Sequence, residues 1–145
     1  VRQALYQAID IQALRTQVMR GLATPTAVPT PNPKGEGIPA ELDQRYPYDL
    51  GAAKKLLAEA GYPNGFGFTL HCPNDRYVND EKVIQAIGQM WSRAGVQTKV
   101  EALTWTNFIG RASKQEFSAF FAAQVVATVK VATAFLVSKH GLKIC

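Results

Sequence analysis

The pattern of apolar and polar residues is most regular between Tyr48 and Leu70. Its first part has apolar residues at a spacing of three and four, which predicts a helix with one buried face. These residues are Ala53, Leu56, Leu57 and Ala60. Asp49 is placed to accept hydrogen bonds from the first-turn amides of this helix, and Gly61 is placed to end it. Beyond a turn, apolar residues alternate with others over Phe66–His71, which predicts a strand.

The rest of the chain shows the same two periods. Helices are expected at Val1–Ile9, at Ile11–Arg20 with Asp10 as its cap, at about Asp80–Ala94, and from Thr104 or Thr106 to about Lys114. Further strands are expected at Val96–Ala102 and from about Phe117. Because helices and strands alternate, we expect an α/β fold with a largely parallel or mixed sheet and helices on its faces. Residues 1–145 are expected to form a single domain.

The segment Leu22–Pro47 breaks this pattern, because it holds six of the eight prolines. Proline is excluded from helix interiors and from central strands, so the segment is expected to be neither. We expect an ordered, extended loop that wraps the domain, and a disordered linker is the alternative. The proposed apolar anchors of this loop are Ile38, Leu42, Tyr46 and Tyr48.

The stretch Phe117–Val137 is almost uncharged, which raises the question of a membrane span. Polar residues interrupt it at Gln124, Thr128, Lys130 and Thr133. A lysine near the centre of a spanning helix is costly, and β-branched residues favour strands. We therefore expect strands here and no membrane-spanning segment.

Charge and cysteine content exclude some classes of function. The chain has 16 basic and 11 acidic residues, a formal net charge of +5, and the basic residues are scattered. This argues against a nucleic-acid partner, which would need a basic cluster with exposed aromatic residues. The two cysteines, Cys72 and Cys145, cannot define a disulfide framework. No signal peptide is recognised and the chain begins inside a predicted helix, which indicates a piece of a longer protein.

Catalytic signals are weak. The only histidines are His71 and His140, and no nucleophile, metal or phosphate-binding motif is present. His71 and Cys72 are adjacent on a predicted strand, so their side chains point to opposite faces and cannot form a dyad. Asp80 is interpreted as a helix cap. We expect no enzyme, no catalytic residue, no metal and no cofactor.

A binding site is the better hypothesis. Ligands of α/β proteins lie at the carboxyl ends of the strands, where the sequence places Asn74, Arg76 and Tyr77. The planar guanidinium of an arginine binds a carboxylate through two parallel hydrogen bonds. The alternatives are that Arg76 is simply exposed and that Tyr77 covers the edge of the core. Trp105 is also expected at the core edge, and Trp91 inside the core.

Two motifs carry a resemblance. The pattern YD-x3-AKKLLAEAGYP-x-GF at 48–66 and the segment VRQALYQAID at 1–10 resemble the extracytoplasmic solute-binding proteins of peptide- and nickel-type ABC importers, family 5. The likeness runs from Val1 to about Phe121 and implies one lobe of a periplasmic-binding-protein type II fold. For the full-length protein it implies a periplasmic or other extracytoplasmic location, a peptide-like solute and ABC permease partners. It also implies that Arg76 binds the ligand's terminal carboxylate.

The resemblance ends before the chain does. Where the family has a Gly-Trp pair and an acidic segment, this chain has Ala123-Gln124 and no acidic residues. Residues 123–145 are therefore interpreted as a divergent tail, and a shifted reading frame is one hypothesis for it. Since a single lobe leaves a ligand half exposed, affinity should be weak. The alternative function is a folded remnant that associates with itself through the exposed cleft face.

Overall fold

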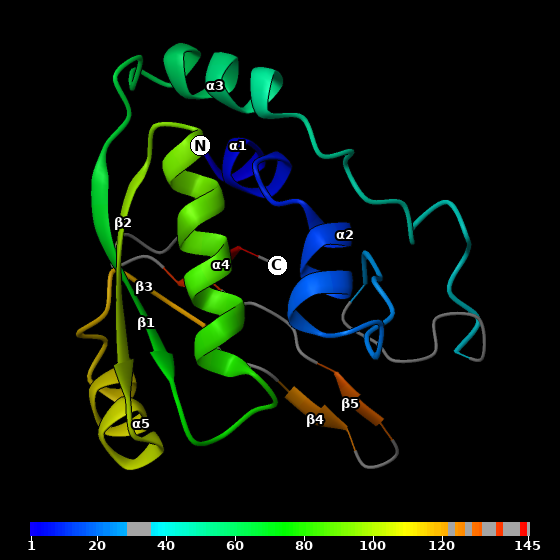
Figure 1. Ribbon diagram of the computed structural model, residues 1–145, viewed down its shortest axis with the longest axis vertical. Coiled ribbons are helices and arrows are strands. Elements are labelled where there is room, and N and C mark those ends of the chain that lie inside the picture. The colour runs from blue at the N-terminus through cyan, green and yellow to red at the C-terminus, as the bar shows by residue number, and fades with distance from the viewer. Residues whose placement is uncertain (29–35, 122–123, 127–128, 132–135, 138–142, 145) are drawn as a thin grey trace.

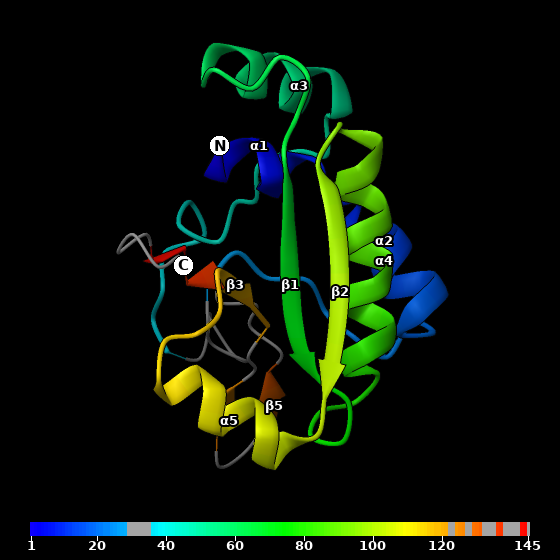
Figure 2. The ribbon, with the colours of Figure 1, turned by 90° about the vertical axis from the view of Figure 1, so that its left-hand side faces the viewer.

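The computed structural model describes residues 1–28, 36–121, 124–126, 129–131, 136–137 and 143–144. Its centre is a three-stranded parallel sheet with the strand order β2-β1-β3. The strands are β1 (Gly67–Pro73), β2 (Gln97–Leu103) and β3 (Ala119–Phe120). Figure 2 shows β1 and β2 side by side, both running from the α3 end of the molecule to the α5 end. The predicted parallel pairing of the first two strands is confirmed, in the register Gly67 with Gln97 through Pro73 with Leu103.

Helices cover both faces of this sheet, as predicted. The two connecting helices are α4 (Asp80–Arg93) and α5 (Trp105–Ser113). Phe68 of β1 contacts Trp91 of α4, with ring centroids 5.7 Å apart. His71 follows Phe68 by three residues on β1, so the two side chains lie on opposite faces of the sheet. His71 faces the α5 side, where Phe117 stacks on it. The carboxyl ends of β1 and β2 meet the start of α5 at the lower end of the molecule (Figure 1).

A buried indole on α4 forms a hydrogen bond with the N-terminal helix. Trp91 is 1% exposed, and its Nε1–H donates to the carbonyl oxygen of Leu5 at 2.8 Å. Leu5 belongs to α1 (Arg2–Gln7), which also packs against α3 (Leu50–Glu59). Trp91 and Leu5 belong to the same hydrophobic core as Leu57, Leu70, Ile84, Ile87 and Val96.

Two predicted helix caps are confirmed, and two other predictions about helices need correction. Asp10 accepts from the Ala13 amide at 2.9 Å, and Asp49 from the Ala52 amide at 2.8 Å, so both predicted caps are confirmed. Ala60 was predicted on the buried face of α3, but it is exposed because the helix ends at Glu59. The predicted second helix is also wrong in form, since α2 covers only Ile11–Ala13 and a π-helical turn, η1, follows at Leu14–Val18.

The proline-rich segment has no helix or strand in its described parts, 22–28 and 36–47. Polar contacts hold these parts to one another. The Asp43 carboxylate accepts from the Thr26 hydroxyl at 3.0 Å and from the Ala27 amide at 2.6 Å. Arg45 donates to the Thr26 carbonyl at 2.8 Å, and its guanidinium lies 4.6 Å from the centre of the Tyr6 ring.

The predicted apolar anchors of that segment are largely wrong. Leu42, Tyr46 and Tyr48 are exposed, and only Ile38 is half-buried. Tyr46 makes an edge contact with Tyr6 at 5.9 Å, which leaves most of its surface in water. The ordering contacts come from charged and hydroxyl side chains, which a search for apolar anchors does not find.

Two turns at the upper end of the sheet touch each other through glycines. Gly65 precedes β1 and Gly95 precedes β2, and both have positive φ, +75° and +97°. A Cβ on Gly65 would lie 1.8 Å from the carbonyl oxygen of Gly95. The Gln97 amide donates to the Phe66 carbonyl at 2.8 Å, so this contact stands at the beginning of the β1–β2 ladder.

The described parts of the tail are short strands. β4 (Gln124–Val126) pairs antiparallel with β5 (Val129–Val131), and β6 (Leu136–Val137) with β7 (Lys143–Ile144). His140 and Cys145 lie outside the described residues, and the divergent-tail interpretation stays a prediction. Among the described residues, no helix has both the length and the apolar character needed to cross a membrane.

Candidate functional site

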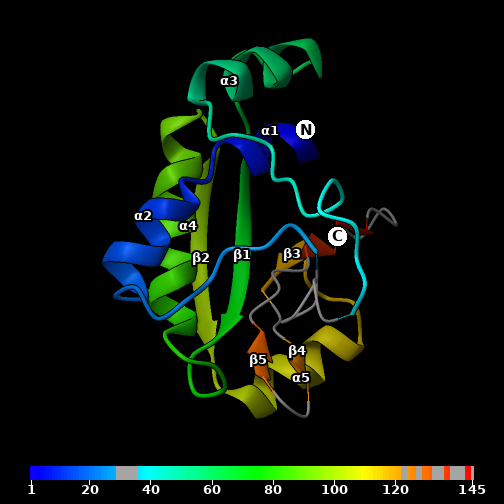
Figure 3. The ribbon, with the colours of Figure 1, turned by 90° about the vertical axis from the view of Figure 1, so that its right-hand side faces the viewer.

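The loop between β1 and α4 brings the three predicted binding residues to the carboxyl end of the sheet. Asn74, Arg76 and Tyr77 all lie in it, at the end of the molecule where α5 begins (Figure 3). The Asn74 amide donates to the carbonyl of Leu103 at 3.0 Å, which extends the β1–β2 ladder into the loop. The side chains of Asn74 and Arg76 are exposed, and that of Tyr77 is half-buried.

A buried carboxylate fixes the backbone of this loop. Asp80 is 4% exposed, and its Oδ2 accepts from the amides of Arg76 at 3.1 Å and Tyr77 at 3.0 Å. Its Oδ1 accepts from the Glu81 amide at 2.9 Å. The prediction of Asp80 as the cap of α4 needs correction. Asn79 occupies the N-cap position with φ +56°, and Asp80 reaches back to hold the loop.

The Arg76 guanidinium lies over aromatic rings and not beside a carboxylate. Its central carbon is 5.0 Å from the centre of the Trp105 ring and 5.9 Å from that of Tyr77. Within the described part of the chain, Arg76 makes no ion pair. A cation over an aromatic face is favoured by the ring quadrupole, and the stacked guanidinium keeps its N–H donors for another partner.

Tyr77 and Trp105 lie at the edge of the core, which was the alternative interpretation for Tyr77 and the expectation for Trp105. Tyr77 makes edge contacts with Trp105 at 6.1 Å and with Phe121 at 5.9 Å. Trp105 stacks in turn on the buried Phe108 at 5.8 Å. One side of each ring is therefore used in packing. A contact of Tyr77 or Asn74 with a ligand stays a prediction.

The candidate site does not coincide with the main hollow of the described structure. A hollow of about 600 Å³ lies elsewhere, along the first halves of β1 and β2, where it is lined by Thr69, Ser92 and Lys99 among others. Arg76 is not among its lining residues.

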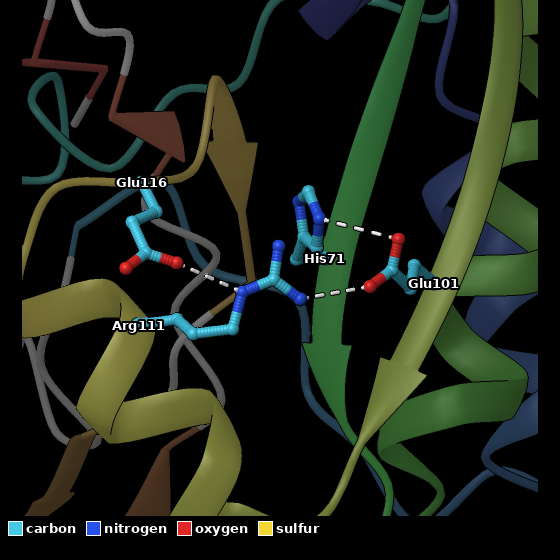
Figure 4. A network of polar contacts seen from close by, with 4 residues as sticks. All are labelled: His71, Glu101, Arg111 and Glu116. Carbon is cyan, nitrogen blue, oxygen red and sulfur yellow. Dashed lines mark hydrogen bonds and ion pairs between the residues drawn. The ribbon is translucent and has the colours of Figure 1, made fainter.

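A second polar cluster lies on the α5 face of the sheet (Figure 4). Arg111 of α5 donates from Nη1 to Glu101 of β2 at 2.9 Å and from Nε to Glu116 at 3.1 Å. His71 Nε2 is 3.6 Å from the other oxygen of Glu101. The His71 ring stacks on Phe117, with centroids 4.1 Å apart. These contacts tie β1, β2 and α5 together, which is a structural role.

Neither His71 nor Cys72 is set up as a nucleophile or base. Burial, with a contribution from Asp80, raises the pKa of the Cys72 thiol to about 12, so the thiol stays protonated. His71 and Cys72 face opposite sides of β1, as predicted. Among the residues the structure describes, no three His, Cys, Asp or Glu side chains gather as a metal site would require.

Comparison with known proteins decides the family. The family model described as bacterial extracellular solute-binding proteins, family 5 Middle, matches residues 1–140. The chain belongs to this family.

Two curated relatives illustrate the sequence likeness of this family 5 chain. Heme-binding protein A of Haemophilus influenzae is 36% identical over 125 residues, which cover 82% of this chain and 22% of that protein. Glutathione-binding protein GsiB of Pectobacterium atrosepticum is 39% identical over 103 residues, or 71% of this chain and 19% of that protein. The chain therefore spans about a fifth of the length of the curated relatives it matches.

Solved structures confirm the predicted fold class, part of a periplasmic-binding-protein type II fold. The periplasmic binding protein DppA of Helicobacter pylori, in complex with the peptide STSA, matches with a TM-score of 0.69 and 28% identity. The match covers 80% of this chain and 22% of DppA. AgaA of A. tumefacien R10, in complex with agropinic acid, gives a TM-score of 0.70 at 29% identity, covering 80% and 23%.

Sequence reasoning missed one residue beside the candidate site. Asp75 Oδ1 accepts from the backbone amide of Trp105 at 2.7 Å, across 30 positions of sequence. Thr104 and Thr106 were the predicted caps of α5, but Thr104 stands at the N-cap position without a side-chain hydrogen bond. The sequence holds no local signal for Asp75, because its partner is brought close only by the β1–β2 pairing.

The buried histidine gives a prediction for stability against pH. Burial lowers the pKa of His71 from its ordinary value of 6.5, so the folded state favours the neutral ring. Its contribution is present above pH 6.5 and is lost as the pH falls through the folded-state pKa. Between about pH 7.5 and 5.5, the free energy of unfolding should fall by at most about 1.4 kcal/mol per pH unit from this group.

Urea unfolding of wild type and His71→Phe at both pH values checks this. The variant keeps an aromatic ring that can stack on Phe117, but it has no titratable group at this position. Its free energy of unfolding should change less with pH than that of wild type. Glu101 does not interfere, because its hydrogen bond from Arg111 lowers the pKa of that carboxyl below 4.5. Equal pH slopes for the two proteins would show that His71 is not the group responsible.

Proposed function

We propose that this chain is part of the solute-binding component of an ABC importer, and that it takes oligopeptide-like or similar solutes. The observation that carries the proposal is the Arg76 guanidinium. It is exposed, stacked 5.0 Å over Trp105, and without an ion-pair partner among the described residues. It stands at the carboxyl end of a parallel strand, where α/β proteins bind ligands. Arg76, with Asn74 and Tyr77 beside it, would receive a terminal carboxylate.

Two of the relatives support this class of ligand. One is a glutathione-binding protein and another was solved with the peptide STSA. Both of those ligands carry free carboxylates on a peptide backbone. The role we propose for the whole protein is to capture the solute outside the cytoplasmic membrane and to deliver it to the permease subunits. Binding without catalysis agrees with the protonated Cys72 and with the structural use of His71.

Replacing Arg76 by alanine should abolish most of the affinity for a free C-terminal carboxylate. A hydrogen bond to a charged group contributes about 1.5–3 kcal/mol, so the dissociation constant should rise by about 10- to 100-fold. Titration of the chain with trialanine, followed by amide chemical shifts in NMR, measures the weak affinity expected of an open site. Trialanine amide, which lacks the carboxylate, should bind wild type about as weakly as trialanine binds Arg76→Ala.

Arg93→Ala is the matched control. Arg93 is an exposed arginine in the last turn of α4, at the opposite end of that helix from the loop. This variant should bind trialanine as wild type does. If trialanine and its amide bind wild type equally, or if neither binds, the proposed role of Arg76 is wrong. Sedimentation of the same samples tests self-association through the exposed face, the alternative function.

A further inference from the structure

The loop that carries Arg76 is joined to the start of α5 by one carboxylate, Asp75. We propose that Asp75 is a positioning residue, which holds Trp105 under the Arg76 guanidinium and so presents Arg76 to a carboxylate ligand. The proposal rests on the proposed function of Arg76, which is the immediate neighbour of Asp75 in the chain.

The contact itself is short and well placed. Asp75 Oδ1 accepts from the amide of Trp105, the first residue of α5, at 2.7 Å. First-turn amides have no partner inside their own helix, and the helix dipole favours a negative charge at this end. Because Thr104 makes no side-chain cap, Asp75 supplies the cap of α5 from another loop.

This contact completes the support under Arg76. The Arg76 backbone is held by Asp80, whose Oδ2 accepts its amide at 3.1 Å. The ring on which the guanidinium rests belongs to Trp105, whose backbone is held by Asp75. The Arg76 side chain thus extends from a backbone that Asp80 of α4 holds. It rests on the ring of Trp105, whose backbone Asp75 holds at the start of α5. A long side chain already restricted in this way loses less entropy when it binds a ligand.

The negative charge of Asp75 and its hydrogen bond to Trp105 should have opposite effects on the affinity for an anionic ligand. The proposal can therefore be tested. A negative charge beside Arg76 should weaken the binding of an anionic ligand. Removing that charge should therefore leave affinity unchanged or improved, provided that the hydrogen bond to Trp105 is kept. Asp75→Asn keeps an oxygen acceptor without the charge, whereas Asp75→Ala removes both. Only loss of the acceptor should loosen Trp105.

The first readout needs no ligand. A guanidinium over an indole has its Nε–H resonance shifted upfield by the ring current, and NMR of the full chain measures this for Arg76. The upfield shift should be kept in Asp75→Asn and lost in Asp75→Ala. The second readout is the trialanine affinity, which should fall by about two- to tenfold in Asp75→Ala and not fall in Asp75→Asn.

Asp49→Ala is the matched control, because Asp49 makes the same kind of hydrogen bond to the first turn of α3, far from Arg76. It should lose comparable stability and leave both readouts at wild-type values. The proposal is overturned if Asp75→Ala keeps the Arg76 shift, or if Asp49→Ala weakens trialanine binding as much. A lost shift in Asp75→Ala with no trialanine binding by wild type would support the positioning and contradict the proposed function.

Discussion

Replacing Gly65 by alanine should lower the free energy of unfolding by about 2–5 kcal/mol. Gly65 has φ +75°, a left-handed conformation that costs an L-residue about 1–2 kcal/mol. The new Cβ would also lie 1.8 Å from the carbonyl oxygen of Gly95, a backbone atom that has no rotamer through which to move away. Forcing these turns apart should add about 1–3 kcal/mol, the usual cost of overpacking. Urea unfolding monitored by circular dichroism measures the change.

Gly61→Ala separates the two causes. Gly61 also has a left-handed φ, +89°, but a Cβ there would meet nothing within 4 Å. This variant should lose only the conformational part, about 1–2 kcal/mol. Equal losses in the two variants would mean that the contact between the turns before β1 and β2 carries no steric cost.

The second large effect is expected at Trp91. Changing it to phenylalanine should cost about 2–4 kcal/mol of free energy of unfolding, from lost packing and an orphaned acceptor. The side chain is 1% exposed, and its Nε1–H donates to the Leu5 carbonyl at 2.8 Å. Phenylalanine cannot donate to this buried carbonyl. Because Leu5 lies in α1, hydrogen exchange of the α1 amides should accelerate more than that of the β1 amides.

Trp105→Phe is the control for this variant. Trp105 is half-buried, and its indole N–H makes no hydrogen bond to the residues described. The same chemical change should cost it under about 1 kcal/mol, since no buried acceptor is left unpaired. If Trp91→Phe were no more destabilising than Trp105→Phe, the indole–Leu5 bond would not hold α1 in place.

Local signals in the sequence were enough for most of the fold. A cap such as Asp49 and a helix-ending glycine such as Gly61 act within four residues, so their partners can be found by counting. The alternation at Phe66–His71 and Val96–Ala102 likewise reports which side chains share a face. These signals placed α3, α4 and the β1–β2 pair within about one to two residues of their observed bounds.

The candidate site was predicted only in part, because its supports are tertiary. The loop containing Arg76 follows from the end of a strand, so its position could be predicted. Asp75 reaches Trp105 across 30 residues, and the Asp43 carboxylate reaches Thr26 across 17. The spacing of apolar residues does not reveal such distant partners. Residue type alone is also a poor guide to burial, since Leu42 is apolar and yet exposed.

The bond from Trp91 to Leu5 also sets an order of events during synthesis. The two residues are 86 positions apart, so α1 leaves the ribosome long before the indole that secures it. At about 5–20 residues per second, the interval is roughly 4–17 s. Through this interval the apolar face of α1, with Ala4 and Leu5, has no partner from α4. Helix α1 can therefore pack on α3 before it packs on α4, and its contact with α4 is completed only after Trp91 has been synthesised.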